Sequence, residues 1–176
     1  MGEFVGDLLD RIPKRERTKA RKKAMPKWTG PMHAKLTHDY FSDEDWIFEP
    51  KLDGERIMAY IDSKGNVRLM SRNKKEVNDS YPEIQKALEK QAPPKCILDG
   101  EVSKKSGVKA YYYIFDCLYI AGHDITKCGL RSRKKALKAA IDWKDPIRWT
   151  PHRNKDGLRY YKEACRKGLE GLIAKD

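Results

Sequence analysis

The stretch that decides the fold is Ile47-Phe48-Glu49-Pro50-Lys51-Leu52-Asp53-Gly54-Glu55-Arg56. Pro50 has no backbone N–H and Gly54 has no Cβ, so the pattern predicts a tight bend between two extended segments. Lys51 then projects from the end of a strand. A lysine amine attacks as a nucleophile only when neutral, and burial or nearby cations favour that form. The alternative is a solvated turn in which Lys51 and Arg56 pair with neighbouring carboxylates, which is the more common case for an isolated K-x-D-G.

Three further motifs follow in order along the chain. They are Leu98-Asp99-Gly100-Glu101-Val102, Tyr113-Ile114-Phe115-Asp116-Cys117-Leu118 and Glu170-Gly171-Leu172-Ile173-Ala174-Lys175. Together with the K-x-D-G-x-R pattern of residues 51–56, they resemble the motifs of the covalent nucleotidyltransferases, which are the polynucleotide ligases and the mRNA capping enzymes. The four motifs stand in the family's order, each at an expected strand or strand end, and the resemblance covers most of residues 32–176.

Within that family, residues 49–56 and 170–175 are most similar to ATP-dependent DNA ligases, especially the compact bacterial and archaeal type related to end-joining enzymes. The resemblance implies an adenylation domain that uses ATP and Mg²⁺ or Mn²⁺ and acts on nicked duplex DNA. A lysine would attack the ATP α-phosphate to form lysyl-AMP, AMP would pass to a DNA 5′-phosphate, and the 3′-OH would seal the nick. Two alternatives stay open, an RNA ligase or capping-type guanylyltransferase, and a catalytically inert nucleic-acid-binding module.

The resemblance also assigns residues to the nucleotide. Lys51 would be the nucleophile, Glu49 would receive the adenine amino group, and Phe115 would stack on the base. Glu101 would hold the ribose, and Lys175 would face the phosphates. A structural explanation remains for several of these residues, since Phe115 can belong to the core of an aromatic strand and Glu101 can be a strand-end carboxylate.

The remaining implied roles concern charge. Glu170 would lie near the divalent metal, with Glu101 as a second metal carboxylate. Arg56 would lie by the ribose and the nick phosphate, and Arg72 by a phosphate of the nucleic acid. The alternative for Arg72 is an ordinary turn cation.

Composition agrees with a polyanionic partner. The chain has 176 residues, within the size of one domain, and carries 36% charged residues with a net charge of +12. No apolar run reaches the length of a membrane span, so we expect a cytoplasmic, nucleoid-associated protein. The four cysteines show no C-x-x-C spacing and are expected to be reduced thiols, mostly packed.

The N-terminal residues are expected to form a basic, flexible arm over residues 1–31. Residues 11–27 contain nine Lys or Arg against one acid, a charge of +8 that repels itself and gains order by neutralising phosphates. Residues 32–176 are expected to form the adenylation domain, truncated at its C-terminus. The family normally continues into further strands and an OB-fold domain, which is absent from this chain and expected in the full protein or in a partner.

The hydrophobic pattern predicts alternating hairpins and helices. Residues 57–61 and 67–70 are expected to be strands joined by a turn at 62–66, followed by a helix that Ser80 caps and that ends near Gln91. A short strand is expected at 96–98, and a central strand buried on both faces at 111–118.

After residue 118, we expect a helix that Ser132 caps and whose lysines face solvent, followed by a strand at 147–149. The next expected helix is ended by Gly168 and has an apolar face that includes Leu158 and Cys165. A last strand is expected at 170–175. The order favours an α+β fold. As the resemblance implies, this would be the nucleotidyltransferase (ATP-grasp-like) fold of mostly antiparallel sheets flanked by helices.

Overall fold

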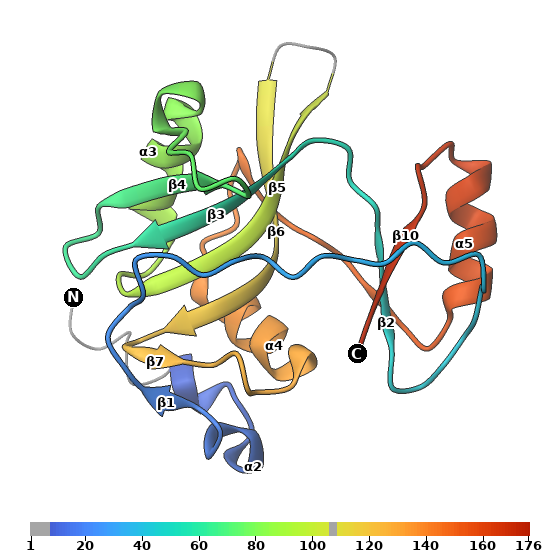
Figure 1. Cartoon of the computed structure of the whole chain (residues 1–176), viewed down its shortest axis with the longest axis horizontal. Coiled ribbons are helices and arrows are strands. Elements are labelled where there is room, and N and C mark those ends of the chain that lie inside the picture. Colours follow the sequence, from blue (N-terminus) through green and yellow to red (C-terminus); the bar gives the residue numbers. More distant parts are fainter. Residues whose placement is uncertain (1–7, 106–108) are drawn as a thin grey trace. The chain divides into compact units, whose positions relative to one another are not determined.

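The computed structural model describes residues 8–105 and 109–176. The chain divides into two compact units (Figure 1). The first comprises Met1–Pro31 and Gly54–Trp149, and the second comprises Met32–Asp53 and Thr150–Asp176. No helix in the described part of the chain combines the length and the apolar character needed to cross a bilayer.

The first unit is built on a seven-stranded sheet. Its strand order is β1-β7-β6-β5-β3-β4, with β8 paired to β6 beside this path. The pairs along the path are antiparallel, and β8 runs parallel to β6, so the expected, mostly antiparallel α+β fold is confirmed. The strands are β1 (Arg21–Lys22), β3 (Glu55–Ile61), β4 (Val67–Ser71), β5 (Cys96–Lys105), β6 (Lys109–Ile120), β7 (His123–Asp124) and β8 (Ile147–Trp149).

Two helices pack on this sheet, α3 (Pro82–Gln91) and α4 (Leu130–Ala140). The main core joins Ile57 of β3 to Leu88 of α3 and Leu137 of α4, all fully buried. A second cluster on the sheet contains Met58 and Tyr60. All of Ile57–Ile61 is buried, because residues from the N-terminal segment pack against the face that carries Met58 and Tyr60.

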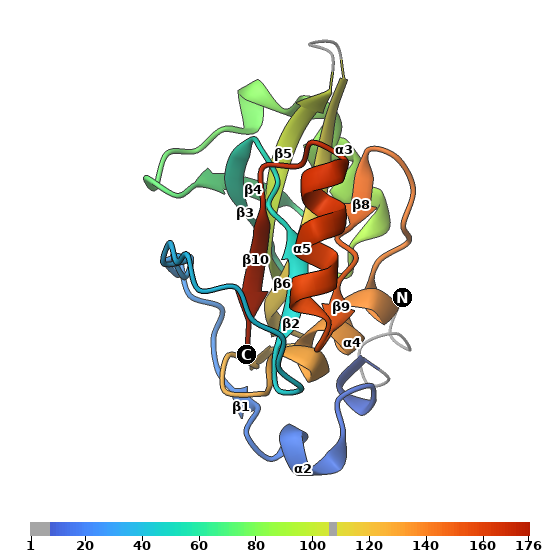
Figure 2. The same cartoon turned by 90° about the vertical axis from the view of Figure 1, so that its right-hand side faces the viewer.

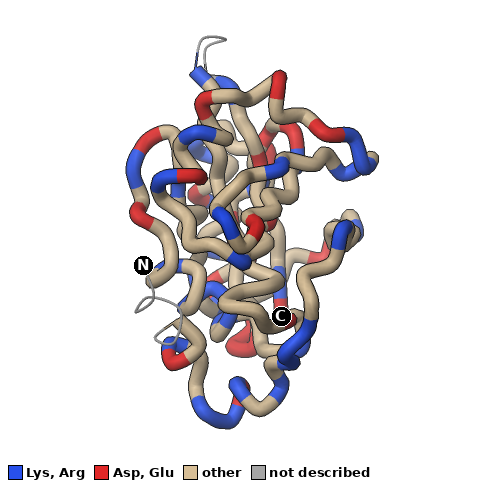
Figure 3. Tube along the Cα trace, turned by 90° about the vertical axis from the view of Figure 1, so that its left-hand side faces the viewer, with Lys and Arg blue, Asp and Glu red and all other residues tan. Residues whose placement is uncertain are grey.

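The N-terminal segment is packed where the structure describes it, which differs from the expected flexible arm. Leu8 and Ile12 are 4% and 0% exposed and belong to the main core. A short helix, α2 (Lys14–Arg17), precedes β1, and the Trp28 ring stacks on Tyr60 with centroids 6.5 Å apart. These apolar residues tie a basic segment to the sheet, and Figure 3 shows its Lys and Arg positions along the chain trace. Residues 1–7 lie outside the described part of the chain.

The second unit is smaller. Its three-stranded sheet has the order β10-β2-β9 and consists of β2 (Ile47–Pro50), β9 (Arg153–Asn154) and β10 (Leu172–Lys175). Helix α5 (Gly157–Arg166) lies along it (Figure 2). A Cβ at Gly157 would lie 2.2 Å from the Phe41 carbonyl oxygen, so only glycine fits this close approach. Gly168, two residues after the end of α5, has the left-handed backbone expected of a glycine that terminates a helix, but Leu158 on the predicted apolar face is 44% exposed.

Three local predictions need correction. Ser80 closes a 3₁₀ turn, η1 (Asn78–Ser80), and α3 begins after Tyr81 with Pro82 in its first turn and no side-chain cap. The N-cap of α4 is Gly129, so Ser132 lies inside the helix. The strand expected to be buried on both faces has one buried face, carrying Tyr112, and one half-buried face, because its side chains alternate. The cysteines are free thiols as expected, three buried and one exposed.

Candidate active site

The lysine turn belongs to the second unit. Strand β2 ends at Pro50, and the Lys51 backbone N–H donates to the Gly171 carbonyl oxygen at 2.9 Å, which extends the pairing of β2 with β10 by one residue. This pairing brings the first and last motifs together. The Lys51 side chain is 44% exposed, and its Nζ forms an ion pair with Glu170, which is 50% exposed. Exposed pairs of this kind contribute about 0–1 kcal/mol, so a ligand can replace either partner at low cost.

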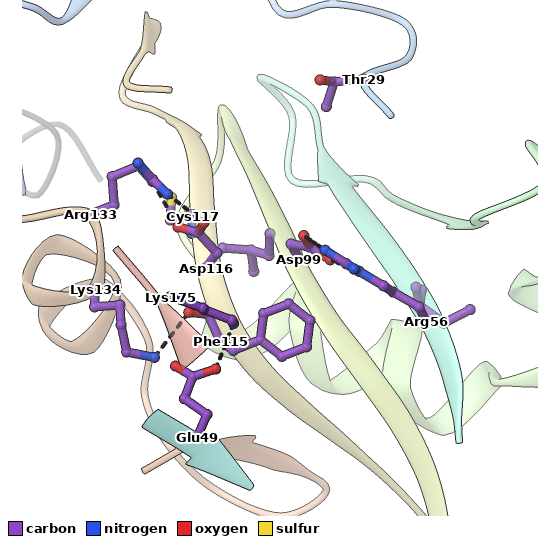
Figure 4. A network of polar contacts seen from close by, with 12 residues as sticks. Thr29, Glu49, Arg56, Asp99, Phe115, Asp116, Cys117, Arg133, Lys134 and Lys175 are labelled. Atoms are coloured by element: carbon purple, nitrogen blue, oxygen red, sulfur yellow. Dashed lines mark hydrogen bonds and ion pairs between the residues drawn. The ribbon is translucent and has the colours of Figure 1, made fainter. Parts of the chain in front are cut away.

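The same two strands form a second ion pair. Glu49 is 2% exposed, and Lys175 Nζ donates to its Oε2 at 2.6 Å (Figure 4). The expected roles gave these two residues to different parts of ATP and did not foresee that they pair. A buried carboxylate requires charged or hydrogen-bonding partners, and Lys175 supplies one of them.

In the first unit, Arg56 is held by a carboxylate. Its Nε and Nη2 donate to Asp99 Oδ1 and Oδ2 at 3.0 and 2.7 Å, and Asp99 is 4% exposed. Burial of the guanidinium opposes its charge, but the hydrogen bonds to Asp99 and the nearby charge of Glu101 outweigh burial, so the pKa of Arg56 is raised. Arg56 and Glu101 are opposite each other in the β3–β5 register.

Phe115 lies on β6 beside this arginine. The Arg56 guanidinium is 5.2 Å from the centroid of the Phe115 ring, a cation–π distance. The ring is half-buried, not part of a closed core. The structure therefore brings Arg56, Glu101 and Phe115 together on three neighbouring strands.

Arg72 lies in the turn after β4, one residue beyond Ser71, which pairs with Ile57 of β3. The turn is closed by two backbone hydrogen bonds, from Lys74 N to the Ser71 carbonyl and from Ser71 N to the Lys75 carbonyl, at 3.0 and 2.8 Å. The Arg72 side chain is exposed. The expected site residues thus divide into two sets, with Glu49, Lys51, Glu170 and Lys175 in the second unit and Arg56, Arg72, Glu101 and Phe115 in the first.

The sequence prediction missed two residues of α4. Arg133 donates to both oxygens of Asp116, and Lys134 is 1% exposed, with its Nζ donating to the Phe115 carbonyl at 3.0 Å (Figure 4). The expectation that the lysines of this helix face solvent is therefore wrong for Lys134. A signal was present, since Lys134 follows Leu130 by four residues and precedes Leu137 by three, on the buried stripe of the helix.

Comparisons with known proteins agree with these motifs. Residues 31–105 and 102–176 match the family model described as ATP dependent DNA ligase domain. The multifunctional non-homologous end joining protein LigD of Pseudomonas aeruginosa is 31% identical over 183 residues, which cover 93% of this chain and 22% of that protein. The SPbeta prophage-derived DNA ligase-like protein LigB of Bacillus subtilis is 29% identical over 169 residues, 84% of this chain and 60% of that protein.

A solved structure shows the same fold. Mycobacterial DNA ligase D, complexed with ATP and MES, superposes with a TM-score of 0.64 at 26% identity, covering 83% of this chain and 53% of that one. This confirms the nucleotidyltransferase fold expected from the motifs. The chain spans less than two thirds of the length of each of these three relatives. With its motifs, its fold and a family match over residues 31–176, the chain belongs to the family of ATP-dependent DNA ligase domains.

Proposed function

We propose that the chain is the adenylation domain of an ATP-dependent DNA ligase, with Lys51 as its nucleophile. The Lys51 amine attacks the α-phosphorus of ATP, a phosphorus–nitrogen bond forms, and pyrophosphate leaves. AMP then passes to a 5′-phosphate at a nick in duplex DNA, and the adjacent 3′-OH displaces AMP to close the strand. The observation that carries this proposal is the position of Lys51, accessible at the end of β2 and paired with Glu170 by an exchangeable ion pair.

The resemblance assigns nucleotide contacts to residues of both units. In the second unit, Glu49 accepts from the adenine amino group, since a carboxylate has room for about four hydrogen bonds and can keep Lys175 as a partner. Lys175 also brings positive charge toward the phosphates. In the first unit, Phe115 stacks on the base and Glu101 holds the ribose.

The nucleic-acid phosphates are assigned to arginines of the first unit. Arg56 has a fixed orientation because of Asp99, whereas Arg72 is exposed in its turn. The net charge of +12 favours a DNA partner and, with it, a protein of the cytoplasm and nucleoid.

A divalent metal, Mg²⁺ or Mn²⁺, fits the carboxylates present. Mg²⁺ in nucleotide sites is bound by one or two carboxylates together with substrate phosphates. Glu170 is a half-exposed carboxylate beside the nucleophile, and Glu101 is the second candidate. Within residues 8–105 and 109–176, no cluster of three or more His, Cys, Asp or Glu could hold an ion, so the phosphates would complete the coordination. When bound, the metal neutralises the charge on the phosphates.

The test is to locate the covalent bond. The chain, and the longer protein where the gene encodes one, is incubated with magnesium and ATP carrying a labelled α-phosphate, and the adduct is mapped by mass spectrometry. We expect one AMP on Lys51, with little label from GTP because the Glu49 carboxylate would repel the guanine carbonyl oxygen. AMP on Lys175 or another lysine would overturn the assignment, and preferential labelling by GTP would favour a capping-type enzyme.

A further inference from the structure

Phe115 is an extra residue in its strand. In the β5–β6 register, Asp99 is opposite Asp116 and Gly100 is opposite Ile114, so the pairing passes over Phe115. This is a β-bulge, a feature that turns a side chain away from the regular alternation and needs support from outside the ladder. The orientation of the Phe115 ring therefore depends on what holds this part of the backbone.

Helix α4 holds the bulge through two consecutive residues. Lys134 Nζ donates to the carbonyl oxygen of Phe115 at 3.0 Å. Arg133 donates from Nε and Nη2 to the two carboxylate oxygens of Asp116 at 2.9 and 2.8 Å, and the Asp116 Oδ1 accepts from the Cys117 backbone N–H at 2.8 Å. The bulged residue and the residue after it are thus both tied to one rigid helix.

The ring itself is contacted from another strand of the same unit. Arg56 lies 5.2 Å from the ring centroid and is held in place by Asp99. The Phe115 side chain therefore lies beside the guanidinium of Arg56, and its carbonyl oxygen accepts from the buried ammonium of Lys134. Both contacts restrict how the ring can tilt.

Lys134 is not required simply to fill its position in the fold. It lies on the buried stripe of α4, where leucine or methionine would fill the space without placing an ammonium in the interior. Its Nζ also lies 4.5 Å from the centroid of the Trp149 ring, which stabilises the charge where it is. A buried ammonium aimed at the carbonyl of a bulged residue is an arrangement that orients this residue.

We infer that Lys134 is a positioning residue for recognition of the nucleotide base. It fixes the backbone of Phe115, and this sets the angle at which the Phe115 ring stacks on the base. The inference rests on the proposed function, in which Phe115 stacks on adenine. Lys134 acts through Phe115 and does not touch the nucleotide. It should affect the binding of the base and leave the binding of the phosphates unchanged.

The test compares a ligand that carries the nucleoside with one that lacks it. α,β-Methylene-ATP cannot transfer AMP, so its dissociation constant with magnesium reports reversible binding, and inorganic triphosphate reports binding of the phosphates alone. The variants are Lys134→Met, Phe115→Leu and the double variant. Lys135→Met is the matched control, because Lys135 is the next residue of α4 and is exposed. Melting temperatures establish that each variant is folded.

The free energy of one hydrogen bond corresponds to a roughly threefold to tenfold increase in a dissociation constant. We expect that increase for α,β-methylene-ATP with Lys134→Met, no change for triphosphate, and no change for either ligand with Lys135→Met. With leucine at position 115, Lys134→Met should have no further effect. If Lys134→Met does not fold, Lys134→Gln replaces it, since glutamine keeps a donor but is too short to reach the Phe115 carbonyl, and the same expectations apply.

Unchanged binding of α,β-methylene-ATP in folded Lys134→Met would overturn the inference. So would an equal loss for both ligands, or an effect that persists in full with leucine at position 115, because either would mean a general structural role. If the wild-type protein binds α,β-methylene-ATP no better than triphosphate, the proposed function itself is contradicted. The two failures are therefore distinguishable.

Discussion

The two units hold their key cations in opposite ways. In the first, Arg56 and Asp99 form a two-point pair whose side chains are 23% and 5% exposed. In the second, Lys51 and Glu170 form a pair whose side chains are 44% and 50% exposed. Breaking a buried pair leaves a charge without compensation and costs about 3–5 kcal/mol, whereas an exposed pair contributes about 0–1 kcal/mol. The first arrangement is fixed and the second can exchange.

This difference suits the two tasks. A residue that orients a ligand gains from fixed geometry, because the ordering cost is met when the protein folds. A nucleophile has to lose a proton and change its partner during the reaction, which an exposed ion pair permits. In the proposed function, Arg56 would orient the ligand and Lys51 would react with it, and the two ion pairs suit these proposed roles.

The largest expected effect comes from replacing Lys51, the lysine of the exposed ion pair. Lys51→Arg keeps the positive charge, but a guanidinium is never neutral at working pH and cannot attack phosphorus. Labelling by ATP should fall below detection, while the melting temperature stays close to that of the wild type. Lys155→Arg is the control, an exposed lysine of the same unit that pairs with Glu44. Labelling of Lys51→Arg at a substantial rate would mean that another residue is the nucleophile.

The second prediction sharpens the comparison by measuring both pairs in the same way. Asp99→Ala should lower the free energy of unfolding by about 3 kcal/mol, because Arg56 keeps its charge in a partly buried place. Glu170→Ala should change it by less than about 1 kcal/mol. Denaturant unfolding of both variants and the wild type provides the measurement. Equal losses would contradict the distinction between a fixed and an exchangeable pair.

Much of this architecture could be predicted from sequence because it depends on local patterns. The turn at residues 51–54, the hairpin through 62–66 and the glycine end of α5 follow from Pro, Gly and alternation. The order of the motifs along the chain then linked Lys51, the proposed nucleophile, to the last motif through one family. What the motifs do not contain is the tertiary pairing that neutralises their side chains.

The failures of prediction have a common physical cause. Lys134 was placed in solvent because lysine usually is, although its position matches the buried stripe of α4. Similarly, Glu49 and Lys175 were given separate ligand contacts, since strand register between residues so far apart in sequence cannot be read from composition. The N-terminal segment was expected to be an arm because its charge outweighs a few apolar residues, yet Leu8 and Ile12 belong to the main core and Trp28 stacks on Tyr60.

The last prediction concerns that docked segment. With the segment attached to the first unit, its exposed cations form a fixed basic surface, and deleting it would also remove core residues. Neutralising charge is the cleaner change, so Lys14, Arg15, Lys22 and Lys23, all exposed, are replaced by glutamine. If all four contact phosphates, the slope of log affinity for duplex DNA against log salt should flatten by about 3–4. The matched control replaces four exposed lysines elsewhere in the first unit, Lys86, Lys90, Lys127 and Lys135. Equal slopes for the two fourfold variants would show that only net charge matters, and that the segment is not a specific contact surface for DNA.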